Sequence, residues 1–95
     1  MNLGKVVGTL VSTRKETSME GLKFLLVRHV DAEGKETGTF TVAADAVGAG
    51  PDELVLVATG SSARQTNATD KRPCDAVIMA IVDSWDIDGV EKYKK

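Results

Sequence analysis

Apolar and β-branched residues gather in five short runs along the chain. The runs are rich in Val, Ile, Leu and Thr, as strands prefer, and they occupy residues 5–13, 22–30, 38–43, 53–59 and 75–83. Clusters of Gly, Pro, Asp and Glu separate them, at residues 19–21, 31–34, 48–52 and 71–73. Strands of this number and spacing predict an all-β fold, a small five-stranded antiparallel barrel or sandwich.

The connections add two smaller expectations. The second and third runs meet around Gly34 and are predicted to form a hairpin. The segment 61–66, which follows Gly60, is predicted to form one short helix with Ser61 or Ser62 as its N-cap. Residues 1–83 are thus expected to form one barrel domain, and residues 84–95 a polar C-terminal tail.

The strands carry apolar side chains on both faces. Successive strand residues point to opposite sides, so a small lone barrel should alternate apolar and polar positions. The continuous runs 24–27, 54–57 and 77–82 do not alternate, and the chain has no long helix to cover them. If six to eight outward side chains each lost ~80–100 Å² on assembly, the gain would be on the order of 12–20 kcal/mol before association costs. This pattern predicts a homo-oligomer. The alternative is that loops and the short helix fold back over one face.

Composition narrows the class of protein. The chain has 95 residues, of which 42% are hydrophobic and 27% charged, as expected for one globular domain. No apolar run is long enough to span a bilayer, and the first residues lack the pattern of a secretory signal, so a cytoplasmic location is expected. The net charge of −2 offers no general attraction for nucleic acid or for an anionic membrane.

Candidate catalytic and metal-binding residues are sparse. His29 is the single histidine and Cys74 the single cysteine, and the carboxylates fall mostly at turns or in the solvated tail. No catalytic residue, no metal site and no cofactor is therefore predicted, and the chain is not expected to be an enzyme.

Two binding hypotheses stay open beside the oligomer. The segment from Gly60 to Arg64 offers backbone N–H groups, hydroxyls and a guanidinium to a small anion, although close approach of subunits is favoured there. A five-stranded barrel can also act as a nucleic-acid-binding module, which would need aromatic platforms in a basic groove. Phe24 and Phe40 lie in core-like runs instead, and the basic residues are scattered.

Four segments in order resemble a known family. They are residues 4–13 (GKVVGTLVST), 43–50 (AADAVGAG), 60–64 (GSSAR) and 73–83 (PCDAVIMAIVD). Together they resemble the EutN/CcmL-type vertex proteins of bacterial microcompartments, over residues 1 to about 90. Cys74 occupies a position that the family pattern leaves variable.

The resemblance implies a fold, an assembly and a role. The fold is a five-stranded barrel similar to the oligonucleotide-binding fold but not used for that purpose. The assembly is a cyclic homopentamer that fills the five-fold corners of a shell whose facets are hexameric shell proteins, with no reaction of its own. The family's signature positions fall on two segments, which are expected near subunit contacts or the central opening. They comprise Gly48, Ala49 and Gly50 in one segment and Gly60, Ser61, Ser62, Ala63 and Arg64 in the other.

Overall fold

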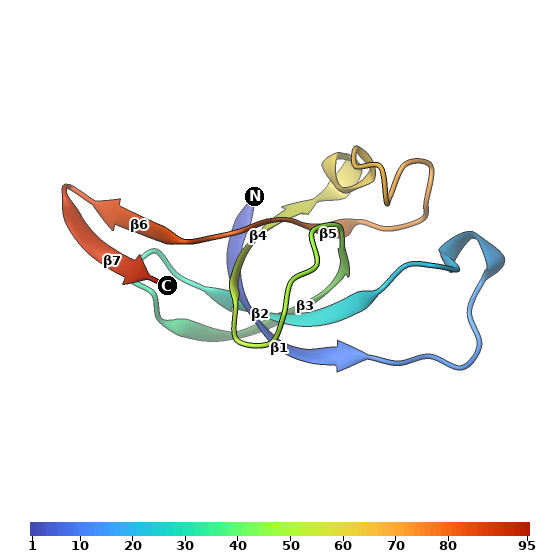
Figure 1. The fold of residues 1–95 in the computed structure, drawn as a ribbon, viewed down its shortest axis with the longest axis horizontal. Coiled ribbons are helices and arrows are strands. Elements are labelled where there is room, and N and C mark those ends of the chain that lie inside the picture. Colours follow the sequence, from blue (N-terminus) through green and yellow to red (C-terminus); the bar gives the residue numbers. More distant parts are fainter.

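Five strands close into a barrel in the order β1, β2, β3, β5, β4 (Figure 1). The structure, a computed structural model, describes residues 1–95. The barrel strands are β1 (Asn2–Leu10), β2 (Phe24–Val30), β3 (Glu36–Asp45), β4 (Leu54–Thr59) and β5 (Ala76–Ile81). The remaining elements are the 3-10 helices η1 (Thr17–Met19) and η2 (Gly60–Arg64), and a separate hairpin of β6 (Ser84–Ile87) and β7 (Val90–Lys94). The predicted five-stranded barrel is confirmed.

One seam of the barrel departs from the predicted antiparallel arrangement. The pairs β1–β2, β1–β4, β2–β3 and β4–β5 are antiparallel, whereas β3 and β5 run parallel through Ala44 opposite Val77. The reason is geometric. A closed ring with an odd number of strands cannot reverse direction at every step, so at least one neighbouring pair must be parallel.

The first strand begins and ends three residues earlier than the sequence predicted. Asn2 lies opposite Val57 of β4, so pairing with β4 extends β1 toward the N-terminus. Leu10 lies opposite Phe24, the first residue of β2, and the chain beyond Leu10 passes the end of its partner strand. Strand bounds therefore follow the available partners rather than the apolar run.

The hairpin predicted around Gly34 is confirmed as the β2–β3 connection. The Asp31 carboxylate accepts hydrogen bonds from the backbone N–H groups of Glu33 and Lys35, both at 2.9 Å. Gly34 has a φ of +87°, a conformation in which a side chain would be strained. A short polar side chain and a glycine thus define this turn.

The predicted short helix exists as η2, but its predicted cap does not. Thr59 precedes η2, and no side chain caps its first turn. The Gly60 N–H instead donates to the carbonyl of Asp75 at 2.8 Å, which ties the start of η2 to the residue before β5. The prediction of Ser61 or Ser62 as N-cap is therefore wrong, because a tertiary backbone bond at Gly60 fixes this end of η2.

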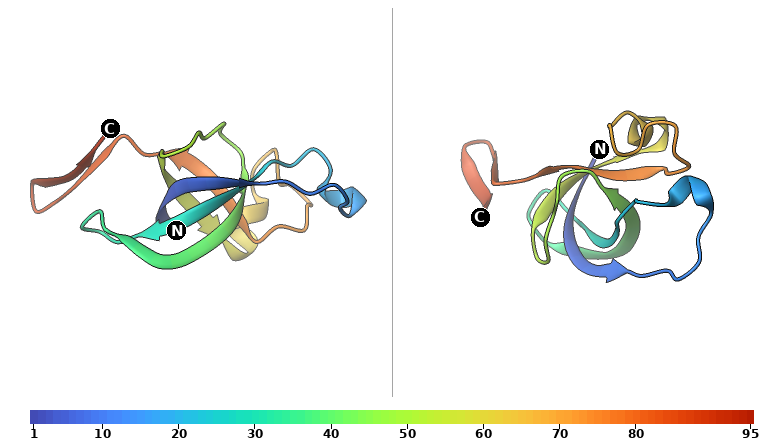
Figure 2. Two further views of the ribbon diagram at one scale, coloured as in Figure 1. Left: turned by 90° about the horizontal axis from the view of Figure 1, so that it is seen from below. Right: turned by 45° about the vertical axis from the view of Figure 1, so that its right-hand side comes forward.

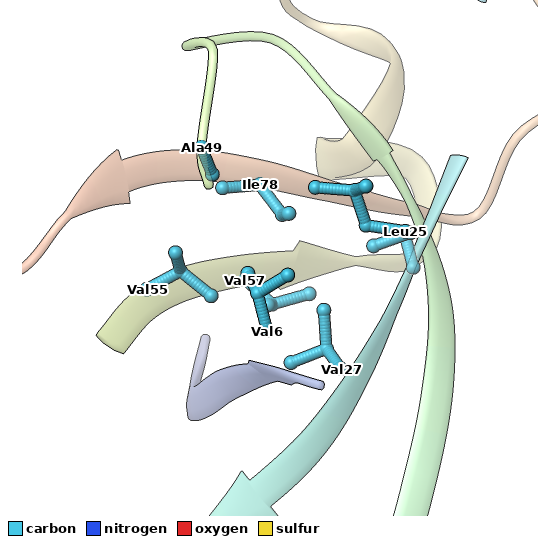
Figure 3. Close-up of a cluster of buried hydrophobic side chains, with 9 residues drawn as sticks. Val6, Leu25, Val27, Ala49, Val55, Val57 and Ile78 are labelled. Atoms are coloured by element: carbon cyan, nitrogen blue, oxygen red, sulfur yellow. The ribbon is translucent and has the colours of Figure 1, made fainter. Parts of the chain in front are cut away.

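Side chains from every barrel strand fill the interior (Figure 3). This inner cluster consists of Val6, Leu25, Val27, Ala43, Ala49, Val55, Val57, Ala76 and Ile78. Burying one Val, Leu or Ile of this kind stabilises the fold by roughly 1.5–3 kcal/mol. The barrel is also tight, since a Cβ at Gly4 would collide with the Val27 side chain. Glycine is therefore required where β1 crosses the filled interior.

A second buried cluster lies on the outside of the barrel wall. Ala58 of β4 pairs with Val77 of β5, and Val77 also pairs with Ala44 of β3. These three residues form one cluster with Ala63 of η2 and Cys74, and Ala63 and Val77 are fully buried. The segment 60–75 thus covers this sector of the outer wall, as the fold-back alternative predicted.

The segment that provides this cover is itself anchored. Thr69 is fully buried, and its hydroxyl lies 2.6 Å from that of Thr66. The Arg72 guanidinium donates to the carbonyls of Ser18 and Glu20, at 3.1 and 2.6 Å, and so joins this segment to the β1–β2 connection. Residues 67–72 therefore contain both a buried residue and two long-range hydrogen bonds.

The C-terminal residues form a hairpin where the sequence predicted only a polar tail. It projects from the end of the barrel opposite to the β1–β2 connection (Figures 1 and 2). The Trp85 Nε1–H group donates to the Ala32 carbonyl at 2.8 Å, and the Trp85 and Tyr93 rings stack with centroids 5.1 Å apart. Lys92 pairs with Glu33 at 2.8 Å. The Asp88–Gly89 turn, with φ values of +52° and +79°, is a local hairpin signal that the sequence analysis did not use, whereas the attachments join residues far apart in the chain.

Candidate subunit interface

Apolar side chains remain uncovered on the outer wall of β2 and β3. Leu26 of β2 lies opposite Val42 of β3, with Gly8 of β1 on its other side. Phe40 is half-exposed, and Val42 and Leu10 are 44% and 45% exposed. The name "β2–β3 face" is used below for Leu10, Leu26, Phe40 and Val42. This surface belongs to the part of the two-sided strand pattern that the chain itself does not bury.

Charged groups fix one border of the β2–β3 face. Arg28 lies opposite Phe40, and its guanidinium carbon sits 4.9 Å from the centre of the Phe40 ring. The same guanidinium donates to the Glu36 carboxylate at 2.8 Å, and the Lys5 ammonium lies 3.5 Å from that carboxylate. The hydrogen bond from Arg28 is the main cause that lowers the pKa of Glu36 below its ordinary value. Glu36 therefore stays ionised and holds Arg28 beside the exposed ring.

A smaller apolar surface lies on the other side of the barrel. Leu3 of β1 lies opposite Leu56 of β4, and Leu56 lies opposite Ala80 of β5, so the three form one row. All three are partly exposed, and Met1, next to this row in sequence, is 73% exposed. The name "β4 face" is used below for Leu3, Leu56 and Ala80.

The loop that carries the first signature segment is held by two carboxylates. Asp45 accepts hydrogen bonds from the backbone N–H groups of Val47, Gly48 and Ala49, at 3.1, 3.0 and 3.2 Å. The Gly50 N–H donates to Glu53 at 2.6 Å. Gly48 has a φ of +77° and is exposed, whereas the Ala49 side chain lies in the inner cluster. The loop is therefore rigid, with Gly48 on its outer side.

The second signature segment also divides between surface and interior. Ser61, Ser62 and Arg64 are exposed, whereas Ala63 is buried in the outer cluster. Arg64 donates to the Cys74 carbonyl at 3.4 Å. Because Ala49 and Ala63 belong to two different buried clusters, the structure does not join the two segments into one packed site.

One assignment from the sequence is corrected at this surface. Phe40 was expected in a core-like run, but it is half-exposed on the outer wall. The signal was present in the alternation of β3. Residues 41 and 43 point inward, and Ala43 is fully buried, so residues 40 and 42 must point outward.

The structure contains no group of three or more His, Cys, Asp or Glu side chains arranged to hold a metal ion. Burial is the main cause that raises the pKa of the Cys74 thiol, which disfavours the reactive thiolate. His29 lies against the Thr41 hydroxyl, 2.5 Å from its oxygen. None of the helices in the structure has the length and hydropathy needed to cross a membrane.

Comparison with known proteins decides the family. The model of the family described as "Ethanolamine utilisation protein EutN/carboxysome" matches residues 1–83. The chain belongs to the EutN/CcmL family. Within it, the carboxysome shell vertex protein CcmL of Gloeobacter violaceus is 48% identical over 95 residues, which cover 100% of this chain and 95% of that protein. The shell vertex protein PduN of Salmonella typhimurium is 44% identical over 88 residues, covering 88% and 97%.

Solved structures of EutN/CcmL proteins agree with the fold. The Gloeobacter violaceus CcmL structure has a TM-score of 0.96 and covers 100% of this chain and 98% of its own. The pentameric microcompartment shell protein GrpN of Rhodospirillum rubrum has a TM-score of 0.84 at 42% identity, covering 92% and 99%. The resemblance found in the sequence is thus confirmed, and these relatives give no support to the nucleic-acid-binding alternative.

Proposed function

We propose that this chain is a structural subunit that forms a closed ring of five and caps the five-fold vertices of a bacterial microcompartment shell. The observation that carries the proposal is the uncovered β2–β3 face on a member of the EutN/CcmL family. Vertex proteins of this family, such as CcmL and PduN, are named for this position.

The proposed role is geometric. A flat sheet of hexamers closes into a polyhedron only where five-fold positions replace six-fold ones, and a cyclic pentamer provides one such position. The rim of the pentamer would contact hexameric shell proteins. These contacts can each be weak, because many act together around the shell. In this role the chain binds other shell subunits and catalyses no reaction.

The proposal includes a division of the chain. Residues 1–83 would form the vertex domain, since the family model matches this span and the last barrel strand ends at Ile81. Residues 84–95 would be an appended segment that is not needed to close the barrel. A chain ending at Asp83 that still forms rings would support this division.

The signature segments are proposed to lie near subunit contacts or the central opening. The exposed members Gly48, Ser61, Ser62 and Arg64 are available for this role. Because Ala49 and Ala63 are buried in the subunit itself, bulky residues there test the fold rather than the contact. Ser62→Trp is the sharper probe, and a ring unchanged by it would count against a contact at this position.

Native mass spectrometry tests the ring directly. A subunit of 10.1 kDa predicts a five-chain species of about 50 kDa. In cells, deleting the protein should leave shells elongated or unsealed while the enclosed enzymes remain active in isolation. Normal closed shells in such a strain, with no second vertex protein present, would contradict the proposal.

A further inference from the structure

We propose that a hollow opening from the barrel interior binds a small amphipathic anion, an organic acid with a short apolar chain and one carboxylate. The hollow has a volume of about 310 Å³ and lies between β1, the start of β2 and the loop that joins β3 to β4. None of its lining residues belongs to the β2–β3 face or to the β4 face. The site is therefore distinct from both uncovered surfaces of the barrel wall.

The floor of the hollow is apolar and belongs to the inner cluster. It consists of Val6, Leu25 and Ala49, each at most 3% exposed, and Figure 3 shows their side chains in the barrel interior. An apolar chain that enters the hollow exchanges water for contact with these buried groups. Each methylene transferred in this way favours binding by roughly fourfold.

A cation without an ion-pair partner lies at the rim of the hollow. The ion pairs of the structure use Lys5, Arg28, Lys92 and Lys95, so Lys23 has no carboxylate partner. Lys23 lines the hollow and is exposed. An ammonium group beside an apolar floor matches a carboxylate at the end of an apolar chain.

A bulge in β1 brings a hydroxyl to the same rim. Val6 lies opposite Val27 of β2, whereas Thr9 lies opposite Leu25. The register shifts between Val6 and Gly8, so residues 6 and 9 both face the interior although they are three positions apart. Thr9 is exposed, and its hydroxyl can therefore donate a hydrogen bond to the carboxylate beside Lys23.

Backbone hydrogen bonds hold the walls of the hollow in place. The Asp52 N–H donates to the Val6 carbonyl at 2.9 Å, and the Val6 N–H donates to the Glu53 carbonyl at 3.0 Å. The Asp45 N–H donates to the Lys23 carbonyl at 2.9 Å, which joins the start of β2 to the end of β3. A site formed before the ligand arrives loses little conformational freedom on binding.

A second hollow of similar volume, between the barrel and the C-terminal hairpin, differs in its charges. Lys5 and Lys92 line it, but Lys5 pairs with Glu36 and Lys92 pairs with Glu33. Its cations are thus already matched by carboxylates within the chain. The hollow beside Lys23 is the one that offers an apolar floor together with a free positive charge.

An NMR titration of the isotope-labelled full chain with hexanoate tests the site. Hexanol carries the same apolar chain without a charge, and hexylamine carries the opposite charge. The amide signals of Val6, Thr9, Leu25 and Ala49 should shift most with hexanoate. Hexanoate should bind roughly tenfold more tightly than hexanol, and hexylamine more weakly than either.

Two variants separate the polar contacts. Lys23→Gln should weaken hexanoate binding roughly tenfold and leave hexanol binding unchanged. Thr9→Val keeps the shape of the side chain, removes only the hydroxyl and should weaken hexanoate binding roughly threefold. Lys94→Gln is the matched control, because Lys94 is an exposed lysine of β7 without an ion pair and should leave the affinity unchanged.

Several results would overturn the inference. Equal affinities for hexanoate and hexanol, or an unchanged affinity in Lys23→Gln, would show that the charge of Lys23 selects no anion. Shifts that concentrate at the hairpin hollow, or no shifts up to the solubility of the acid, would show that the site is not here. The three-ligand comparison uses the unaltered chain, so it does not depend on the folding of a variant. The ring is measured separately by native mass spectrometry, so failure of the proposed function and failure of this site are distinguishable.

Discussion

Two sectors of the same barrel wall differ in how far their outward apolar side chains are buried. Around Ala58 and Val77 the outward side chains are fully buried, because η2 and Cys74 pack over them. Around Leu26 and Val42 the outward side chains stay at the surface. The outward positions compared carry apolar side chains in both sectors. An apolar outer face therefore does not by itself indicate a subunit contact, since what matters is whether the chain returns to cover it.

The largest expected difference comes from placing a charge in each sector. Ala63→Asp puts a carboxylate into the covered sector, where it has no water, and should destabilise the subunit by on the order of 3–5 kcal/mol. Val42→Asp puts the same group at a half-exposed position and should leave the subunit folded. Urea unfolding followed by circular dichroism measures both. Equal loss of stability in the two variants would contradict the difference in cover between the two sectors.

A smaller loss of stability is expected when a valine side chain in either sector is shortened to alanine. Val77→Ala leaves a cavity in the covered sector and should cost about 1.5–3 kcal/mol. This loss should appear at every protein concentration. Val42→Ala should lower the stability only where the oligomer is populated, because it weakens association rather than the subunit. Thermal unfolding over a dilution series distinguishes the two, and a concentration-independent loss for Val42→Ala would contradict an interface there.

The C-terminal hairpin is a third kind of region, because only a few contacts attach it to the barrel. Trp85→Phe removes the hydrogen bond to the Ala32 carbonyl and should cost about 0.5–1.5 kcal/mol. Amide hydrogen exchange should accelerate within β6 and β7 and stay unchanged in β1 to β5. Phe retains most of the stacking on Tyr93, so a larger loss that spreads into the barrel would show that the hairpin supports it.

The smallest effect is expected in the pH dependence of stability. Glu53 accepts hydrogen bonds from Lys95 at 2.8 Å and from the Gly50 N–H, and Lys95 is the main cause that lowers the pKa of Glu53 below its ordinary value of 4.5. A lowered pKa in the folded state stabilises the fold above the ordinary pKa, and this stability is lost as the pH falls.

Glu53→Gln should therefore flatten the decrease in Tm across roughly pH 3 to 6. Glu36→Gln should have the same effect at the border of the β2–β3 face, because Arg28 lowers the pKa of Glu36 in the same way. If neither variant changes the acid decrease, these ion pairs do not contribute to it.

The sequence by itself determined the existence of the five barrel strands, the hairpin turn at Gly34 and the two-sided apolar pattern. These features depend on neighbouring residues, on alternation and on turn chemistry, all of which short stretches of the sequence specify. The resemblance to the vertex family also needed only the order of its motifs, because such motifs keep their place along the chain.

Only the tertiary structure decided which apolar positions are covered. Val77 and Val42 are both outward-facing strand valines, yet one is fully buried and the other is 44% exposed. The difference arises from the path of residues 60–75, fixed by long-range contacts such as the bond from Gly60 to Asp75 and that from Arg72 to Glu20. The parallel β3–β5 seam and the docked Trp85 hairpin were hidden for the same reason, since each depends on where distant parts of the chain meet.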